Sequence, residues 1–139
     1  MYKSFLVALI LIISTTTIFA GLNPPQAVLT AFKQKFPTVT KVKWEKENAT
    51  EYEANFEMSG TETSANFKED GTWVETETEV AYFSLPEAVK KSFEKQVTAK
   101  PKEASKIDKP NGVTYYEVEY KDGVKTIEVL FNADGTLVK

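Results

Sequence analysis

The sequence predicts an α+β fold: a tandem repeat of one helix plus four antiparallel strands, with both helices packed on one face of an antiparallel sheet. Three observations predict it. Residues 22–28 and 83–89 are matching segments with prolines at the start of a helix. Each is followed by apolar residues at helical spacing, and then by stretches that alternate apolar and polar residues up to an Asp-Gly turn. The two series occur in the same order, which indicates an internal repeat.

Residues 1–20 are predicted to be a signal peptide. Lys3 precedes an uncharged apolar run at residues 5–13, and Ala20 and Gly21 offer small side chains for cleavage after Ala20, although Ile18 is large for its position. An uncleaved anchor is the alternative, but the run is shorter than the roughly 20 apolar residues that a membrane span needs. We therefore expect a periplasmic or secreted protein without a stable membrane anchor. Residues 21–139 are expected to form one domain of two repeats, 22–82 and 83–139.

Composition excludes several kinds of chemistry. The 139-residue chain contains no histidine and no cysteine, which removes His-based triads, Cys-His pairs and the usual zinc sites. Its net charge of −3 gives little attraction to nucleic acid. We expect no catalytic residue, no cofactor and no metal ligand. Without disulfides, the fold must depend on its core.

Each predicted helix has a start signal and an apolar stripe. Asn23 and Ser84 are expected N-caps, with Gln26 and Glu87 three residues later completing a capping box. Pro37 should end the first helix, and the second should end between residues 95 and 100. The apolar stripes, which we expect to meet in one core, are Val28, Phe32 and Phe36 in the first helix and Val89, Phe93 and Val97 in the second.

The strands are predicted from alternation and from the turns between them. Residues 52–58 and 116–120 place apolar and polar side chains on opposite faces, so one face should be covered by the helices and the other should meet water. Short polar turns make neighbouring strands antiparallel. The expected strands are 41–46, 51–58, 62–67 and 72–80 in the first repeat, and 103–108, 113–120, 124–131 and 136–138 in the second.

Several motifs together resemble a known family. They are Phe36-Pro37, VKWE at 42–45, YEANF at 52–56, ANFKEDGTW at 65–73, TETEV at 76–80 and LPEAV at 85–89. Their order and spacing are similar to the PepSY-like domain, also described as beta-lactamase-inhibitor-protein-like and common in exported proteins of Bacteroidetes. The resemblance covers nearly the whole mature chain. It implies two repeats of a helix packed on antiparallel strands, and inhibition of enzymes or peptidases in the wider group.

The Asp70-Gly71 and Asp134-Gly135 pairs allow two interpretations. A calcium loop needs about six oxygen ligands at alternating positions, and the neighbouring residues do not supply that series. A hairpin turn needs only a glycine that tolerates positive φ. We therefore predict turns.

The predicted open face of the sheet is rich in glutamate. Glu51, Glu53 and Glu57 share one strand face, Glu117 and Glu119 share the matching face, and Glu75, Glu77 and Glu79 form a third row. This face would favour a cationic partner, or it is simply a solvated surface. Trp73 and Tyr115 are either contact anchors or partly buried aromatics. The predicted partner-binding residues are Glu53, Asn55, Trp73, Tyr115, Glu117 and Glu119.

Three functions remain open on the sequence. The first is an exported, non-enzymatic binding module whose open sheet face contacts a protein, a peptide or another cationic ligand. The second is an inhibitor of an exported hydrolase, either a peptidase or a beta-lactamase. The third is a small hydrolase that uses Glu53 or Glu117, which would need a pocket that shifts one pKa. We expect a shallow face rather than a pocket, because the domain has only two layers.

Overall fold

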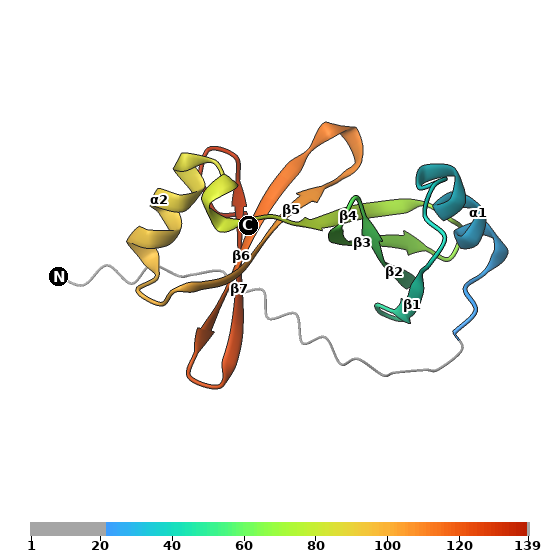
Figure 1. The fold of residues 1–139 in the computed structure, drawn as a ribbon, viewed down its shortest axis with the longest axis horizontal. Helices are drawn as coiled ribbons and strands as arrows, with labels where there is room; N and C mark the ends of the chain where they lie inside the picture. Colours follow the sequence, from blue (N-terminus) through green and yellow to red (C-terminus); the bar gives the residue numbers. More distant parts are fainter. Residues whose placement is uncertain (1–21, 139) are drawn as a thin grey trace.

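The structure is a computed structural model that describes residues 22–138, so the predicted signal peptide lies outside the described residues. Within this range, two α-helices, two 3₁₀ turns and seven strands follow one another (Figure 1). Their bounds are α1 Gln26–Lys35, β1 Lys43–Lys46, β2 Glu51–Met58, β3 Thr61–Lys68, β4 Trp73–Glu79, η1 Tyr82–Ser84, α2 Glu87–Gln96, β5 Pro101–Asp108, η2 Pro110–Gly112, β6 Thr114–Asp122 and β7 Lys125–Asn132.

The strands form one antiparallel sheet in the order β1-β2-β3-β4-β5-β6-β7, so each strand lies beside its neighbours in sequence. This confirms the predicted α+β class and the antiparallel sheet. Helix α1 lies at the β1–β4 end and α2 at the β5–β7 end (Figure 1). The cross-strand partners Ala65, Thr76 and Asp108 continue one face of the sheet from the first end to the second. Both helices pack on that face.

The core is divided into two clusters, so the expectation of one common core is wrong. In the first, Val28 and Phe32 of α1 pack on β2 and β3; in the second, Val89 and Phe93 of α2 pack on β5, β6 and β7. The reason lies where β4 meets β5. The residues on the helix-covered side of that junction are polar and cannot join the two clusters; they are Thr76, Thr78, Lys106 and Asp108.

Both helices begin at a proline, and the predicted capping boxes are wrong. Pro25 and Pro86 are the N-cap residues, and neither helix start has a side-chain cap hydrogen bond. A residue before proline is held in extended conformation, as Leu85 is at ψ 152°, so the helix starts only after the last proline. Ser84 Oγ instead donates to the carbonyl oxygen of Ala81 at 2.7 Å. The last residues of the two helices, Lys35 and Gln96, agree with the predictions.

Two Asp-Gly turns bring the sheet against the helices. Asp70 Oδ1 accepts from the backbone N–H of Thr72 at 2.8 Å, and Asp134 Oδ1 accepts from that of Thr136 at 2.9 Å, so these are turns as predicted. The eighth predicted strand, 136–138, is not formed. Within residues 22–138, Leu137 forms only an isolated bridge with Phe131.

Candidate functional site

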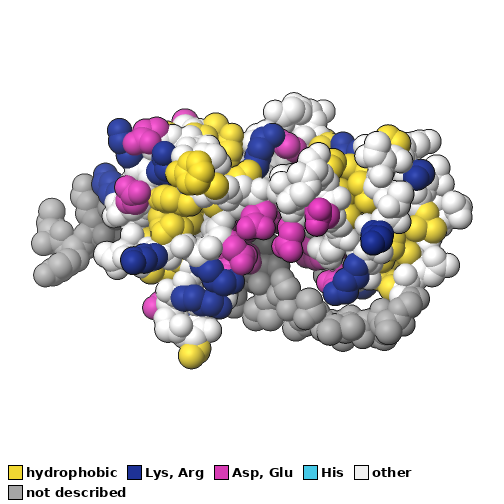
Figure 2. Space-filling view, in the orientation of Figure 1, with side chains coloured by type: hydrophobic (Ala, Val, Ile, Leu, Met, Phe, Trp, Pro, Cys, Tyr) yellow, Lys and Arg dark blue, Asp and Glu magenta, His cyan; other side chains and the backbone are white. Residues whose placement is uncertain are grey.

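The face of the sheet opposite the helices is hollowed into an acidic groove of about 320 Å³. Acidic side chains gather at the middle of the molecule, between its two ends (Figure 2). The expectation of a shallow face rather than a pocket is therefore wrong. Neighbouring strands of a sheet are rotated relative to one another, so side chains from the two ends of this twisted seven-stranded sheet face each other across its middle. The residues that line the groove are Glu45, Lys46, Glu47, Glu53, Ser64, Asn66, Glu75, Glu77, Glu103, Ala104, Ser105, Ile107, Glu117, Glu119, Glu128 and Leu130.

A row of cross-strand partners forms one side of the acidic groove. Glu45 of β1 lies opposite Glu53 of β2, Glu53 lies opposite Asn66 of β3, and Asn66 lies opposite Glu75 of β4. Partners in an antiparallel sheet point to the same face and lie about 4.5–5.5 Å apart at Cβ. Three carboxylates and one amide are thus placed side by side across four strands.

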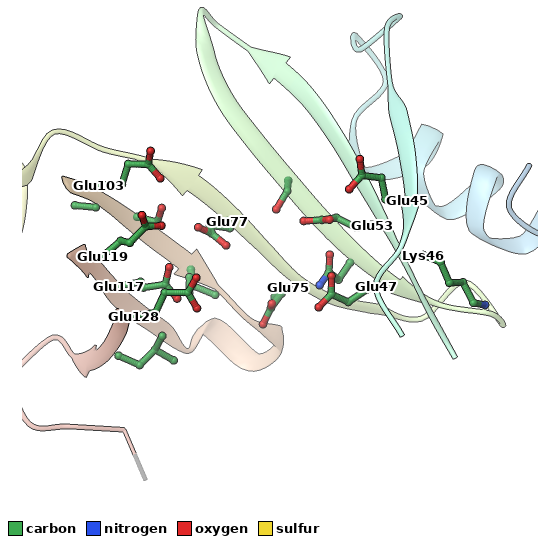
Figure 3. A pocket seen from close by; sticks show the side chains of 16 residues that line it. Glu45, Lys46, Glu47, Glu53, Glu75, Glu77, Glu103, Glu117, Glu119 and Glu128 are labelled. Carbon is green, nitrogen blue, oxygen red and sulfur yellow. The ribbon is translucent and has the colours of Figure 1, made fainter. Parts of the chain in front are cut away.

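The other side of the acidic groove comes from β5, β6 and β7. Glu103, Glu119 and Glu128 are successive cross-strand partners, and Glu117 lies one step along the same face of β6, opposite Ser105. Glu77 of β4 lies between the two sides (Figure 3). The carboxylates from both halves of the chain therefore face one space.

Four of these carboxylates have a lysine partner. Glu45 is paired with Lys43 at 2.5 Å, Glu75 with Lys109 at 2.6 Å, and Glu119 with Lys102 at 2.6 Å. Lys102 also lies 3.4 Å from Glu103. Within residues 22–138, no ion pair involves Glu47, Glu53, Glu77, Glu117 or Glu128.

The carboxylates without a lysine partner are the ones with raised pKa values. Burial raises the pKa of Glu117 to about 8, and the negative charges of Glu77 and Glu128 add to the effect. Burial, followed by neighbouring carboxylates, also raises the pKa of Glu47 and Glu128. Burial is the main cause for Glu53 and Glu77 too, and polar contacts, including Ser64 for Glu53 and Ser105 for Glu77, partly oppose it. A cation in the groove would relieve this repulsion.

Asn66 sits in the floor of the acidic groove with an unsatisfied acceptor. The residue is 9% exposed, and among the described residues its Oδ1 is the one buried side-chain N or O atom that has no hydrogen-bond partner. Buried polar atoms are nearly always hydrogen-bonded, and leaving one unsatisfied costs about 1–3 kcal/mol. Asn66 Oδ1 therefore lacks a hydrogen-bond donor, and the side chains around it in the groove are mostly carboxylates.

The predicted contact residues do not all lie in one place. Glu53, Glu117 and Glu119 line the acidic groove, and Asn55 lines an adjoining hollow of about 230 Å³. Tyr115 is on the same face, opposite groove-lining Ile107, at the margin of the groove.

Trp73 is on the other face. It packs against the α1 core cluster, its Nε1 donates to Thr76 Oγ1 at 3.0 Å, and Lys35 Nζ lies 3.5 Å from its ring centroid. A β-bulge between β3 and β4 places Trp73 opposite Phe67. Trp73 therefore does not belong to the acidic face.

Sequence reasoning missed several residues of the acidic groove. Glu45, Glu103 and Glu128 lie on strands whose register the alternation alone does not give, and Glu47 directly follows β1. Asn66 could have been found, because its neighbours Ala65 and Phe67 are apolar and must point to the opposite face. Of the predicted acidic rows, Glu75 and Glu77 line the groove, whereas Glu51 and Glu57 lie outside it.

A family model described as beta-lactamase-inhibitor-like, PepSY-like matches residues 23–64 and 50–139. The chain belongs to the PepSY-like family. This confirms the resemblance and agrees with the sheet and helices described above.

Solved structures have the same fold as this PepSY-like chain. A Bacteroides eggerthii protein described as periplasmic is 21% identical, with a TM-score of 0.76, covering 85% of this chain and 88% of that chain. A DUF2874 family protein from Bacteroides ovatus is 23% identical, with a TM-score of 0.73, covering 86% and 87%. A BLIP-like protein from Bacteroides fragilis is 28% identical, with a TM-score of 0.69, covering 86% of each chain. No curated protein matches the chain.

The described part of this PepSY-like chain has neither a membrane-spanning helix nor a group of side chains suited to a metal ion. Residues 22–138 contain no helix that is long and apolar enough to cross a bilayer. In the same range, no three or more His, Cys, Asp or Glu side chains are grouped so that they could hold a metal ion. The carboxylates of the acidic groove are thus close enough to repel one another but are not arranged as a metal cage.

Proposed function

We propose that this chain is an exported, non-enzymatic binding module whose acidic groove contacts a basic region of a protein or peptide partner. One observation carries the proposal: five part-buried carboxylates share a concave face, have raised pKa values and have no paired lysine among residues 22–138. A merely solubilising surface would keep its charges apart and in water. Partly desolvated like charges are a cost to the free protein, which a cationic partner would offset.

The proposed contact surface comprises Glu53, Asn55, Tyr115, Glu117 and Glu119, together with the other carboxylates of the groove. The part of the chain that carries it is the sheet, not the helices, because the helices cover the opposite face. The partner should approach along the open face and span the β1–β4 and β5–β7 sides.

Export is part of the same proposal. Residues 1–20 read as a signal peptide, and the similar Bacteroides eggerthii protein is described as periplasmic. We infer a periplasmic or secreted location, and a single domain of two repeats, 22–82 and 83–139. The similar placing of Gly71 against Ala27 and of Gly135 against Ala88 supports the repeat.

Capture of partners from an envelope extract of the source organism tests the contact surface. Glu53, Glu117 and Glu119 are together replaced by lysine, and the bound proteins are identified by mass spectrometry. The control replaces Glu57, Glu94 and Asp122, which lie outside the acidic groove, and makes the same change in net charge. We expect the groove variant to lose the partner and the control to keep it. Equal capture by the two variants would contradict the proposal.

Inhibition of an exported hydrolase is a second candidate. It is favoured by the family description and by the BLIP-like protein from Bacteroides fragilis. An inhibitor would place its groove or a loop at the rim over the cleft of an enzyme. The purified mature chain is assayed against a panel of exported peptidases and beta-lactamases, and absence of inhibition at micromolar concentration would remove this candidate.

We assign no reaction to the acidic groove. Glu117 has the raised pKa that a general acid needs, but burial and the repulsion of neighbouring carboxylates raise its pKa without any catalytic role. Hydrolysis of model glycosides by the wild-type chain, lost in Glu117→Gln, would reverse this assignment.

A further inference from the structure

The β1–β4 side of the acidic groove combines an unsatisfied acceptor with two carboxylates, Glu47 and Glu53, that have no lysine partner among residues 22–138. Asn66 supplies the acceptor, since its buried Oδ1 has no partner in residues 22–138. Its cross-strand neighbours are Glu53 and Glu75. Glu47 completes the group, because it lines the same groove and lies near Glu53 and Glu75 (Figure 3).

The lysines at this side of the groove pair with groups other than Glu47 and Glu53. Lys46 Nζ lies 3.8 Å from the ring centroid of Tyr52 and 3.3 Å from Glu69 Oε1, and it points away from Glu47 and Glu53 (Figure 3). Lys109 Nζ is bonded to Glu75 Oε2 at 2.6 Å. Glu47 and Glu53 therefore have no lysine partner among residues 22–138, and they lie beside the unsatisfied acceptor of Asn66.

We propose that Asn66, Glu47 and Glu53 form a subsite that binds the guanidinium group of one arginine side chain of the partner protein. The inference rests on the proposed function and adds to it the residue type that the partner presents. It also places that residue at one end of the groove, over β1, β2 and β3.

The chemistry of the site favours arginine over lysine. A guanidinium presents five N–H donors in one plane, so it can donate to an amide oxygen at the floor and to carboxylates on the walls at the same time. An ammonium has three donors around one point and holds its water more tightly. Entry into a half-buried site therefore costs the guanidinium less. Burial, the first cause of the raised pKa values of Glu47 and Glu53, shows that the site is already partly desolvated.

An NMR titration of the mature full chain tests the subsite. The probes are N-acetyl-arginine amide, N-acetyl-lysine amide and the neutral isostere N-acetyl-citrulline amide. We expect the arginine probe to shift the side-chain amide signals of Asn66 and to bind about tenfold more tightly than the lysine probe, because the guanidinium can donate to the amide oxygen and to the carboxylates at the same time. The citrulline probe, which carries no charge, should not bind. Equal affinities for arginine and lysine, or shifts confined to residues outside β1–β3, would overturn the subsite.

Two variants and one control complete the test. Asn66→Ala removes the acceptor, and Glu53→Gln removes one charge while keeping the shape, so each should weaken the arginine probe about tenfold. Glu57→Gln makes the same charge change on the same face of β2 but outside the acidic groove, and it should leave the affinity unchanged. Unchanged affinity in Asn66→Ala and Glu53→Gln overturns the proposal.

The proposed binding function and the guanidinium subsite can fail separately. If charge reversal in the groove abolishes partner capture but the arginine probe does not reach Asn66, the binding function stands and the guanidinium subsite falls. If the arginine probe binds at Asn66 but charge reversal in the groove leaves partner capture unchanged, the proposed function falls and with it the role of the subsite.

Discussion

Two glycines hold the sheet close to the helices. Gly71 has φ +87° and Gly135 has φ +82°, and a Cβ at these positions would lie 2.6 Å from the carbonyl oxygen of Ala27 and 2.4 Å from that of Ala88. Both the backbone conformation and the contact therefore require glycine. Gly60 has φ +78° but nothing within 4 Å of such a Cβ, so it provides a matched control in which only the conformation matters.

Replacement of these glycines by alanine should separate the two effects. We expect Gly60→Ala to lower the free energy of unfolding by about 1 kcal/mol, which is the cost of a left-handed L-residue. Gly71→Ala and Gly135→Ala should each cost at least about 2 kcal/mol more, because the helix or the turn must move. Urea denaturation measures the three values. Equal losses of unfolding free energy in all three variants would show that Gly71 and Gly135 do not need to lie so close to the helices.

Glu117 should make the protein less stable as the pH rises. Its pKa is about 8 in the folded chain and near 4.5 in an unfolded one. Between these values the folded state holds a proton that the unfolded state does not, so the free energy of unfolding falls as the pH rises through this window and levels off above it. The cost is complete only above pH 8.

Glu117→Gln removes this dependence. We expect it to raise the free energy of unfolding at pH 8 by about 1–3 kcal/mol and to change it little at pH 4.5. Glu57→Gln, on the exposed end of β2, is the control and should give a difference that hardly depends on pH. Thermal unfolding at a series of pH values provides the measurement, and a parallel shift of the whole curve in Glu117→Gln would refute a raised pKa.

At the scale of elements, each helix forms a core with its own strands. Phe32 of α1 contacts three aromatic rings at centroid distances of 5.2–5.3 Å, those of Phe36, Trp44 and Phe56. Phe93 of α2 contacts Tyr82 and Tyr120, each at 5.9 Å. Polar residues separate the clusters on the helix-covered side of the β4–β5 junction, where only four residue pairs join the strands.

A core mutation in one half should therefore loosen that half first. We expect Phe93→Ala to cost about 3–5 kcal/mol and to raise amide hydrogen exchange in α2, β6 and β7 more than in β2 and β3. Phe32→Ala is the reciprocal variant, with the larger effect in α1, β2 and β3. Uniform loss of protection along the whole sheet in both variants would mean that the sheet unfolds as a single unit.

The elements were largely predictable, and their ends were less so. Alternation and helical spacing gave both helices and seven strands, because side-chain facing follows directly from these periods. The capping boxes failed because proline geometry moved both helix starts past Asn23 and Ser84. Trp73 was placed on the wrong side because a bulge shifts the pairing of β3 with β4, and bulges have no clear sign in one sequence.

At the scale of the whole molecule, the acidic groove is a product of register and twist. The alternation of the strands predicts that Glu53, Glu117 and Glu119 lie on one face of the sheet. It does not predict that they line one groove, because Glu53 comes from the first half of the chain and the other two from the second. A net charge of −3 gives no hint of such local crowding, since lysines elsewhere balance it.

Carboxyl footprinting of the partner complex tests the groove as the contact surface most directly. The mature chain, alone and with its captured partner, is labelled with a carbodiimide and an amine, and each glutamate is quantified by mass spectrometry. We expect that labelling of Glu53, Glu77 and Glu117 falls when the partner binds, while Glu87 and Glu94 of α2 are labelled as before. Protection of the helix glutamates, with the groove carboxylates still labelled, would contradict it.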